Sequence, residues 1–325
     1  MKKKYLIAII LLAFSVYMGC KKDDNNIGGG DGNPPVSNFE ANITNGTVPL
    51  TVIFTDQSSN NPTSWQWEFG DDSTSTKANP SHTYNNIGSY SVVLTVTNAN
   101  GTDRKVKIEY IYVECGPCPG IPTVTYEGQV YNTALIDNQC WLKENLNVGE
   151  MINANTNQAN NGVIEKYCYD NDSANCDEYG GLYKWSEMME YASTQGVQGI
   201  CPPGWHIPTN DEWYILEGTV DSQYPVGHPI WNPYGFQGYD AGLNLKSTSG
   251  WYFKGNGTDL FGFSAFPGGK YYYIYGFIGL GSNGTFWSST NSTRPWSRDL
   301  YEHSDGVDIN NNNPDNGRSV RCLKD

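Results

Sequence analysis

The chain has 325 residues, a formal net charge of −14, and 17% charged against 14% aromatic residues. An acidic chain lacks the basic surface that nucleic acid and anionic lipid headgroups require, so its charge argues against both as partners. Its 36 glycines, 23 tyrosines and 10 tryptophans are typical of a folded, loop-rich, β-leaning protein and not of a disordered one.

The first residues predict an export signal. Lys2, Lys3 and Lys4 form a positive segment, and the apolar run at 6–16 is too short to span a bilayer but has the length of a signal-peptide core. Cys20 directly follows a glycine, which resembles the bacterial lipobox, in which the cysteine thiol is diacylated. We therefore expect a lipoprotein signal peptide at 1–19 and lipidation at Cys20; an ordinary secretory peptide is the alternative.

The segment after Cys20 predicts a tether and a destination. Residues 20–35 contain three consecutive glycines and end in two prolines, which is typical of a flexible linker. Its acidic pair, Asp23 and Asp24, resembles the Bacteroidota signal for export to the outer face of the outer membrane. The expected partner is thus outer-membrane lipid, held through acylated Cys20, with the protein facing the extracellular side.

Residues 36–114 predict an immunoglobulin-like β-sandwich. Short strand patterns recur at 51–55, 65–69, 90–97 and 105–113, separated by turn residues. The sequences WQWEFGD at 65–71, NPSHTY at 79–84 and GSYSVVLTV at 88–96 resemble the PKD domain family. That resemblance implies a spacer or adhesion module. We expect one of Trp65 and Trp67 in its core and the other on an exposed strand.

A Gly- and Pro-rich linker at 115–122 precedes a second domain at 123–325, expected to be α+β and loop-rich. Thr209 and Glu212 have the spacing of a capping box, which predicts a helix start. A second helix is expected at 186–192. Beyond residue 250 the chain is rich in glycine and aromatic residues and shows little periodicity.

Four stretches in this second domain resemble the family described as the Fibrobacter succinogenes major paralogous domain (FISUMP). They are QCWLKENL at 139–146, CPPGWHIPTNDEW at 201–213, FWSST at 286–290 and RSVRC at 318–322. The same pattern is similar to a C-type-lectin-like fold, the fold of formylglycine-generating enzymes. The resemblance implies a surface or secreted module whose loops carry binding.

Cysteine usage predicts disulfides, because export permits them. Seven cysteines follow residue 114, so one stays unpaired. We expect Cys201–Cys322, Cys168–Cys176 and a bond from Cys140 to Cys118, although Cys115 is also available to Cys140. The C-x-x-C spacing of Cys115 and Cys118 lies in a linker, without the helix N-terminus that redox pairs use.

Metal and catalytic patterns are weak. Residues 170–175 loosely resemble a calcium loop but lack the glycine of its sharp turn, so a structural calcium ion competes with a plain disulfide loop. No other cofactor is expected. Glu187, Glu190 and Glu212 are carboxylates of the type that glycosidases use, but no pattern pairs them. We predict a protein that is not an enzyme.

The aromatic C-terminal region is the candidate binding surface, because aromatic rings stack on the C–H faces of sugars. The candidate ligand-binding residues are Tyr271, Tyr272, Tyr273, Tyr275, Trp287, Trp296 and Tyr301. We expect a surface adhesin that recognises glycan or another surface ligand. An assembly component acting through protein contacts is the alternative, and an oxidative enzyme related to formylglycine-generating enzymes is a third interpretation.

Overall fold

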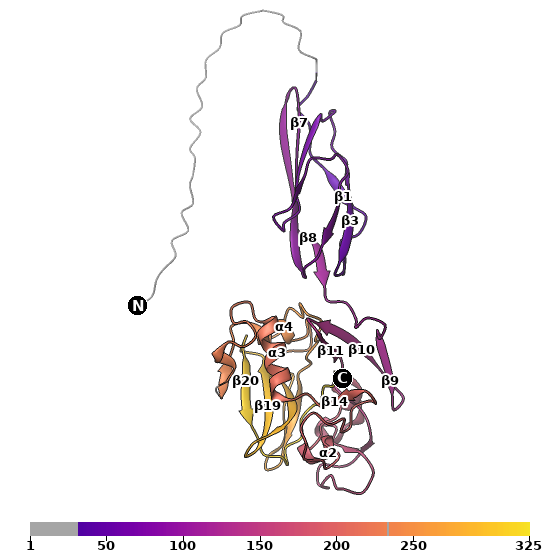
Figure 1. Cartoon of the computed structure of the whole chain (residues 1–325), viewed down its shortest axis with the longest axis vertical. Coiled ribbons are helices and arrows are strands. Elements are labelled where there is room, and N and C mark those ends of the chain that lie inside the picture. Colours follow the sequence, from indigo (N-terminus) through magenta and orange to yellow (C-terminus); the bar gives the residue numbers. More distant parts are fainter. Residues whose placement is uncertain (1–31, 233) are drawn as a thin grey trace, which may run out of the picture.

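The computed structural model describes residues 32–232 and 234–325. The chain is mostly β, and its strands form two units that follow one another along the sequence, β1–β8 and β9–β21 (Figure 1). The predicted signal peptide at 1–19, Cys20 and most of the tether at 20–35 lie outside the described residues. Within the described ranges, no helix has both the length and the apolar character needed to cross a membrane.

The first unit is a β-sandwich, as predicted. In β3, Leu50, Val52 and Phe54 are buried and alternate with exposed residues, so every second side chain enters the core. One sheet has the order β1 (Phe39–Ala41), β3 (Leu50–Asp56), β6 (Ser81–Tyr84). The other has the order β2 (Asn45–Thr47), β8 (Gly101–Glu114), β7 (Gly88–Asn98), β4 (Ser64–Glu68), β5 (Thr74–Ser75).

Aromatic residues fill the core of this sandwich without a disulfide. Trp67 is fully buried, lies 5.1 Å from the Phe39 ring, and donates its indole N–H to the Lys77 carbonyl at 2.9 Å. Trp65 is half-buried and donates to Asp56 at 2.6 Å. One tryptophan is therefore core as expected, while the other is held against the sheet by its hydrogen bond.

The second unit contains a sheet in which the end of the chain lies among earlier strands. Its order is β14 (Trp205–His206), β21 (Leu323–Lys324), β11 (Gln139–Leu142), β10 (Gln129–Ile136), β9 (Thr123–Tyr126). Figure 1 places the C-terminus beside β11 and β14. Leu323 pairs with Trp141 on one side and His206 on the other, so β21 joins two segments that lie far apart in the sequence.

A four-stranded sheet forms the other part of this unit. Helix α3 (Asn210–Val220) packs on it, because Trp213 and Leu216 share one buried cluster with Phe286 and Leu300. The strand order is β15 (Gly235–Gln237), β20 (Val307–Asn311), β19 (Pro295–Tyr301), β18 (Asn283–Asn291). The loop-rich β character expected here is confirmed; the C-type-lectin-like resemblance stays a prediction.

Short elements complete the second unit. They are the hairpin β16 (Gly268–Tyr272) and β17 (Gly276–Leu280), the parallel pair β12 (Glu150–Met151) and β13 (Glu165–Lys166), helices α1 (Ser173–Tyr179), α2 (Trp185–Met188) and α4 (Ala241–Leu245), and the 3-10 turns η1 (Tyr169–Asn171) and η2 (Pro229–Trp231). Most of the remaining chain is loop.

Local signals set the helix boundaries. At α3 the predicted capping box is present: the Thr209 hydroxyl accepts from the Glu212 N–H, and the Glu212 carboxylate accepts from the Thr209 N–H. The helix expected at 186–192 ends at Met188 instead. Glu190 and Tyr191 adopt φ of 47° and 61°, a left-handed conformation that a continuing helix cannot include.

Three disulfides cross-link the second unit: Cys118–Cys140, Cys168–Cys176 and Cys201–Cys322. These are the pairs expected from the sequence. Among the described cysteines, Cys115 has no partner. It is partly buried, and burial, together with the charges of Glu114 and Asp259, raises the pKa of its thiol to about 11, so the thiol stays protonated at neutral pH.

Candidate functional site

The aromatic residues expected to form one binding surface separate into three environments. Tyr272, Tyr273 and Tyr275 lie at the end of the β16–β17 hairpin, and Tyr271 lies beneath them. Trp287 is in the core. Tyr301 and Trp296 lie at opposite ends of β19. The structure therefore brings together the hairpin tyrosines and separates the two tryptophans from them.

The hairpin carries the exposed part of the set. Tyr273 and Tyr275 are 45% and 74% exposed, and Ile274 between them is 59% exposed. The Tyr272 ring lies 6.2 Å from that of Tyr273 and 5.5 Å from that of Tyr275. Three tyrosine rings thus share one projecting tip, with enough open surface for a ligand to stack on.

Tyr271 supports this tip from below and is not an open surface. Its ring lies 4.7 Å from the Tyr167 ring and 5.3 Å from the Phe277 ring, and its hydroxyl donates to the Ala154 carbonyl at 3.1 Å. The alternation of side chains along β16 places Tyr271 and Tyr272 on opposite faces of the strand. Tyr271 fixes the hairpin to the rest of the unit.

Trp287 was wrongly expected among the ligand-binding residues. Its side chain is fully buried, its indole N–H donates to the Tyr183 carbonyl at 2.9 Å, and the Arg318 guanidinium lies 5.1 Å from its ring. Residues of β18 on both faces are covered, because Phe286 shares a buried cluster with α3 and Trp287 shares another with Tyr183, Trp185 and Met188. No ligand can reach this indole in the folded chain.

Tyr301 lies over a buried charge cluster. The Asp299 carboxylate is held between the Lys270 ammonium, at 2.9 Å, and the Arg318 guanidinium. Burial alone would raise the pKa of Asp299, but these two cations outweigh it and keep the pKa below its usual value. The Tyr301 hydroxyl is 3.2 Å from Asp299, and burial beside Asp299 and Asp308 raises the pKa of Tyr301.

The charge cluster links Tyr301 to the hairpin. Lys270 belongs to β16, and its ammonium lies 6.0 Å from the Tyr301 ring. Tyr272 shares a face of β16 with Lys270, two residues further along the strand. Tyr301 and the hairpin tip therefore belong to the same side of the molecule, with the charge cluster between them.

Sequence reasoning missed two aromatic residues and a histidine near Tyr301 and Trp296. Phe236 is 56% exposed, with its ring 5.6 Å from that of Tyr301, and His303 lies 5.4 Å from the same ring. Tyr234 stacks on Trp296. Tyr234 and Phe236 flank Gly235, an alternation that indicates a short strand. The exposure of the two aromatic side chains depends on how that strand pairs in the sheet, which the sequence does not show.

Side chains of the acidic loop at 170–175 make local hydrogen bonds. Asp172 caps α1 by accepting from the Ala174 N–H, and Asn175 donates to the Tyr169 carbonyl. Within residues 32–232 and 234–325, no group of three or more His, Cys, Asp or Glu side chains is arranged to hold a metal ion. These side chains serve the turn that the Cys168–Cys176 disulfide closes.

Of the three carboxylates considered for catalysis, two line one pocket and the third lies elsewhere. Glu187 accepts from the Glu165 N–H at 2.8 Å and from the Tyr191 hydroxyl at 2.7 Å in the wall of a pocket of about 150 Å³; burial raises its pKa. Glu190 lines the same pocket. Glu212 belongs to the α3 capping box, so its place is structural.

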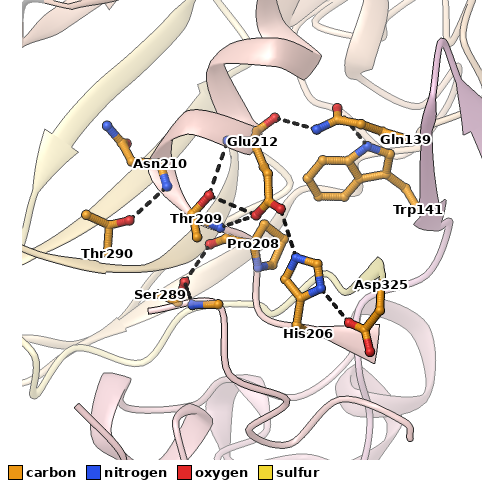
Figure 2. Close-up of polar contacts among 11 residues, drawn as sticks. Gln139, Trp141, His206, Pro208, Thr209, Asn210, Glu212, Ser289, Thr290 and Asp325 are labelled. Atoms are coloured by element: carbon orange, nitrogen blue, oxygen red, sulfur yellow. Dashed lines mark hydrogen bonds and ion pairs between the residues drawn. The ribbon is translucent and has the colours of Figure 1, made fainter. Parts of the chain in front are cut away.

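His206 completes the cluster around Glu212 (Figure 2). Its two ring nitrogens lie 3.0 Å from the Glu212 carboxylate and 2.8 Å from the Asp325 carboxylate. The Glu212 hydrogen bond raises the pKa of His206 above its usual value, although burial opposes it. Histidine between two carboxylates occurs in catalytic sites, but here it ties the end of the chain to the start of α3.

Two family models match the chain. That of the Fibrobacter succinogenes major domain matches residues 135–324, and that of a PKD domain matches residues 32–113. All the strands from β11 to β21 lie within the first match, together with the hairpin tyrosines and the charge cluster.

The collagenase relatives and the solved PKD domains that follow are similar to the PKD part of the chain. Collagenase ColA of Bacillus cereus is 50% identical over 42 residues, which are 13% of this chain and 4% of that protein. The pre-pro-metalloprotease PrtV of Vibrio cholerae is 40% identical over 67 residues, 21% of this chain and 7% of that protein. The chain thus spans a small fraction of these relatives.

Among solved structures, the PKD1 domain of that Vibrio cholerae metalloprotease is 36% identical, covering 24% of this chain and 95% of the domain, with a TM-score of 0.22. The PKD1 domain of Vibrio anguillarum Epp is 28% identical, covering 26% of this chain and 99% of the domain, with a TM-score of 0.23.

Proposed function

The chain belongs to the family of the Fibrobacter succinogenes major domain, and from this and the PKD domain before it we propose that it is a lipid-anchored cell-surface protein that binds glycan. In this proposal the second unit carries the binding surface and the PKD sandwich is a spacer. Acylated Cys20 holds the protein in the outer membrane, facing outward, and the tether lifts the sandwich from the lipid.

The exposed tyrosine tip of the β16–β17 hairpin is the observation that carries the proposal. Large exposed aromatic side chains on one tip are unfavourable unless a ligand covers them. Tyrosine presents a flat apolar ring and a hydroxyl with few rotatable bonds, so little entropy is lost on binding. A pyranose, with an apolar C–H face and a rim of hydroxyls, complements such a surface.

The support below the tip makes it a rigid platform. Tyr271 is held by two aromatic contacts and a hydrogen bond, and the Tyr273 N–H donates to the Asn316 side chain at 3.3 Å. A surface that is ordered before binding loses less entropy when the ligand arrives.

Binding of the secreted chain, with Cys20→Ser to remove the anchor, to an array of host and plant glycans tests this proposal. We expect the double variant Tyr273→Ser/Tyr275→Ser to lose about tenfold or more in affinity, because each ring contributes about 0.5–1.5 kcal/mol. Its melting temperature should stay within about 2 °C of the parent, because both rings lie outside the core.

Tyr239→Ser, at a tyrosine that is 60% exposed and lies outside the hairpin, is the matched control and should keep the affinity. Unchanged affinity of the double variant would contradict the site. If the folded parent binds no glycan at all, the result favours the alternative, an assembly component that acts through protein contacts. Capture of outer-membrane proteins would then test that alternative.

A further inference from the structure

Trp296 and Tyr234 form a stacked pair at the edge of the four-stranded sheet. The two rings lie 4.8 Å apart and are nearly parallel, at 4°. Trp296 packs at the margin of the α3 core, whereas Tyr234 is 55% exposed. Trp296 thus supports one face of the Tyr234 ring from the protein side, and the exposed area of Tyr234 is available to a ligand.

Hydrogen bonding fixes the position of this tyrosine. The Asn311 amide donates to the Tyr234 hydroxyl at 3.0 Å, so the phenol proton stays available to a further acceptor. Asn311 belongs to a run of four partly buried asparagines at 310–313. A flat ring, a free hydroxyl proton and the Asn311 amide are therefore close together on one ledge.

The ledge lies on the opposite side of the sheet from the hairpin tip. Along β19, Trp296 and Leu300 face the α3 core, so the alternation of the strand turns Tyr301 to the other face. Phe236 contacts Tyr301 while Tyr234 contacts Trp296, although only Gly235 separates them. Gly235 has φ 95°, and this conformation directs its two neighbours to different faces.

We propose that the Tyr234–Trp296 ledge is a second carbohydrate subsite, which takes one pyranose unit by stacking its C–H face on Tyr234, with its hydroxyls on the Tyr234 hydroxyl and the Asn311 amide. The ligand class rests on the proposed function, but the residues do not overlap. Two subsites on opposite faces let one copy bind two glycan chains, or two segments of one branched glycan, which raises avidity without new contacts.

Glycan titrations of four forms of the secreted chain test the ledge: the parent, Tyr234→Ala, Tyr234→Phe and Tyr273→Ser/Tyr275→Ser. Tyr234→Ala should weaken binding about tenfold for glycans that the hairpin double variant still binds. Tyr234→Phe should keep the stack and lose only the hydroxyl, with a smaller loss of about two- to fivefold. Tyr239→Ala, at a tyrosine 60% exposed, is the matched control and should bind as the parent does.

The outcomes separate the two sites. If Tyr234→Ala binds like the parent while the hairpin variant does not, the ledge is overturned and the proposed function stands. If the hairpin variant binds like the parent while Tyr234→Ala is weakened, the hairpin assignment fails and the ledge stands. A folded parent that binds no glycan overturns both, and equal melting temperatures of all forms show that binding and not folding was changed.

Discussion

Three arginines of the second unit, Arg298, Arg318 and Arg321, are completely buried. Arg321 donates to the Asn145 side chain and to the carbonyls of Phe263 and Ser264, so its charge is met mainly by oxygen atoms of loops. A unit with few regular elements leaves many carbonyls outside ladders, and buried guanidinium groups, each with five donors, can satisfy several at once. Arg321 therefore satisfies loop carbonyls that no strand ladder reaches.

The buried ion pair of Arg298 and Glu217 leads to a prediction about stability. The Arg298 guanidinium pairs with Glu217 at 2.5 Å, and burial raises the pKa of Glu217 although Arg298 opposes that shift. Arg298→Ala should lower the free energy of unfolding by about 3–5 kcal/mol, because it leaves a buried carboxylate without a cation. Denaturant unfolding at neutral pH measures this. The paired change Arg298→Met with Glu217→Gln should cost clearly less, and an equal cost would contradict the charge argument.

His206 predicts a pH dependence of stability. Because hydrogen bonds to Glu212 and Asp325 raise its pKa in the folded state, its contribution is fully present below the unfolded pKa of about 6.5 and is lost as pH rises through the folded pKa. Hydrogen bonds from His206 and Thr209 outweigh burial and lower the pKa of Glu212, so that carboxylate's contribution is lost instead as pH falls. The pair should stabilise most at mildly acidic pH.

The difference in unfolding free energy between the parent and His206→Gln measures this dependence. It should be largest near pH 6 and should shrink towards about pH 9. His303→Gln, at an exposed histidine, controls for the loss of a histidine as such. A difference that stays constant from pH 6 to 9 would show that the imidazolium charge does not matter.

For single residues, the sequence indicated the aromatic residue types of the binding surface, but it did not indicate which of these side chains are exposed. Tyr273 and Trp287 were expected on the same surface, yet one is open and the other is in the core. The difference comes from Tyr183, Trp185 and Met188, which share the buried cluster of Trp287 and belong to a distant segment. No local pattern encodes such cover, so the burial of an aromatic residue in a loop-rich chain could not be predicted.

At the scale of elements, capping signals were predictive and helix lengths were not. Thr209 and Glu212 marked the start of α3, because a capping box is a local arrangement of side chain and backbone. The helix expected at 186–192 stopped at Met188, since Met188 and Met189 are both drawn into the core while the next two residues turn left-handed. Tertiary burial decided that boundary.

Thr209→Ala tests the cap. The variant should lose about 1 kcal/mol of stability, because the Glu212 N–H at the start of α3 loses its acceptor. In a unit of this size that corresponds to a fall of about 2–4 °C in melting temperature. Thr209→Ser keeps the hydroxyl and should behave like the parent, and a cost as large as that of the alanine variant would point to the methyl group instead.

At the scale of the whole molecule, the disulfides differ in the length of chain that they close. Cys201–Cys322 spans 121 residues, Cys118–Cys140 spans 22 and Cys168–Cys176 spans 8. Loop-closure entropy assigns losses of about 5, 3.5 and 2.5 kcal/mol to their removal in that order. Paired Cys→Ser variants, unfolded in denaturant, should reproduce the ranking, and a reversed order would mean that local strain or packing outweighs chain entropy.

The two-unit architecture was predictable because each unit carries its own motifs. The sandwich is indicated by strand alternation and by WQWEFGD at 65–71. The second unit is indicated by stretches that contain cysteines, two of which are joined in the Cys201–Cys322 disulfide. The arrangement of the loops between those stretches was not predictable, because it depends on contacts such as those of Arg321 across more than 170 residues.

The position of β21 has a consequence for biosynthesis. Residues 323 and 324 follow every other strand of the second unit in the sequence, yet they lie between β14 and β11. During synthesis, the sheet of the second unit cannot close until β21 has been translated. The sandwich before it can already be folded at that time. Until then the unfinished sheet is exposed to proteases and chaperones, because it lacks the strand that joins β14 to β11.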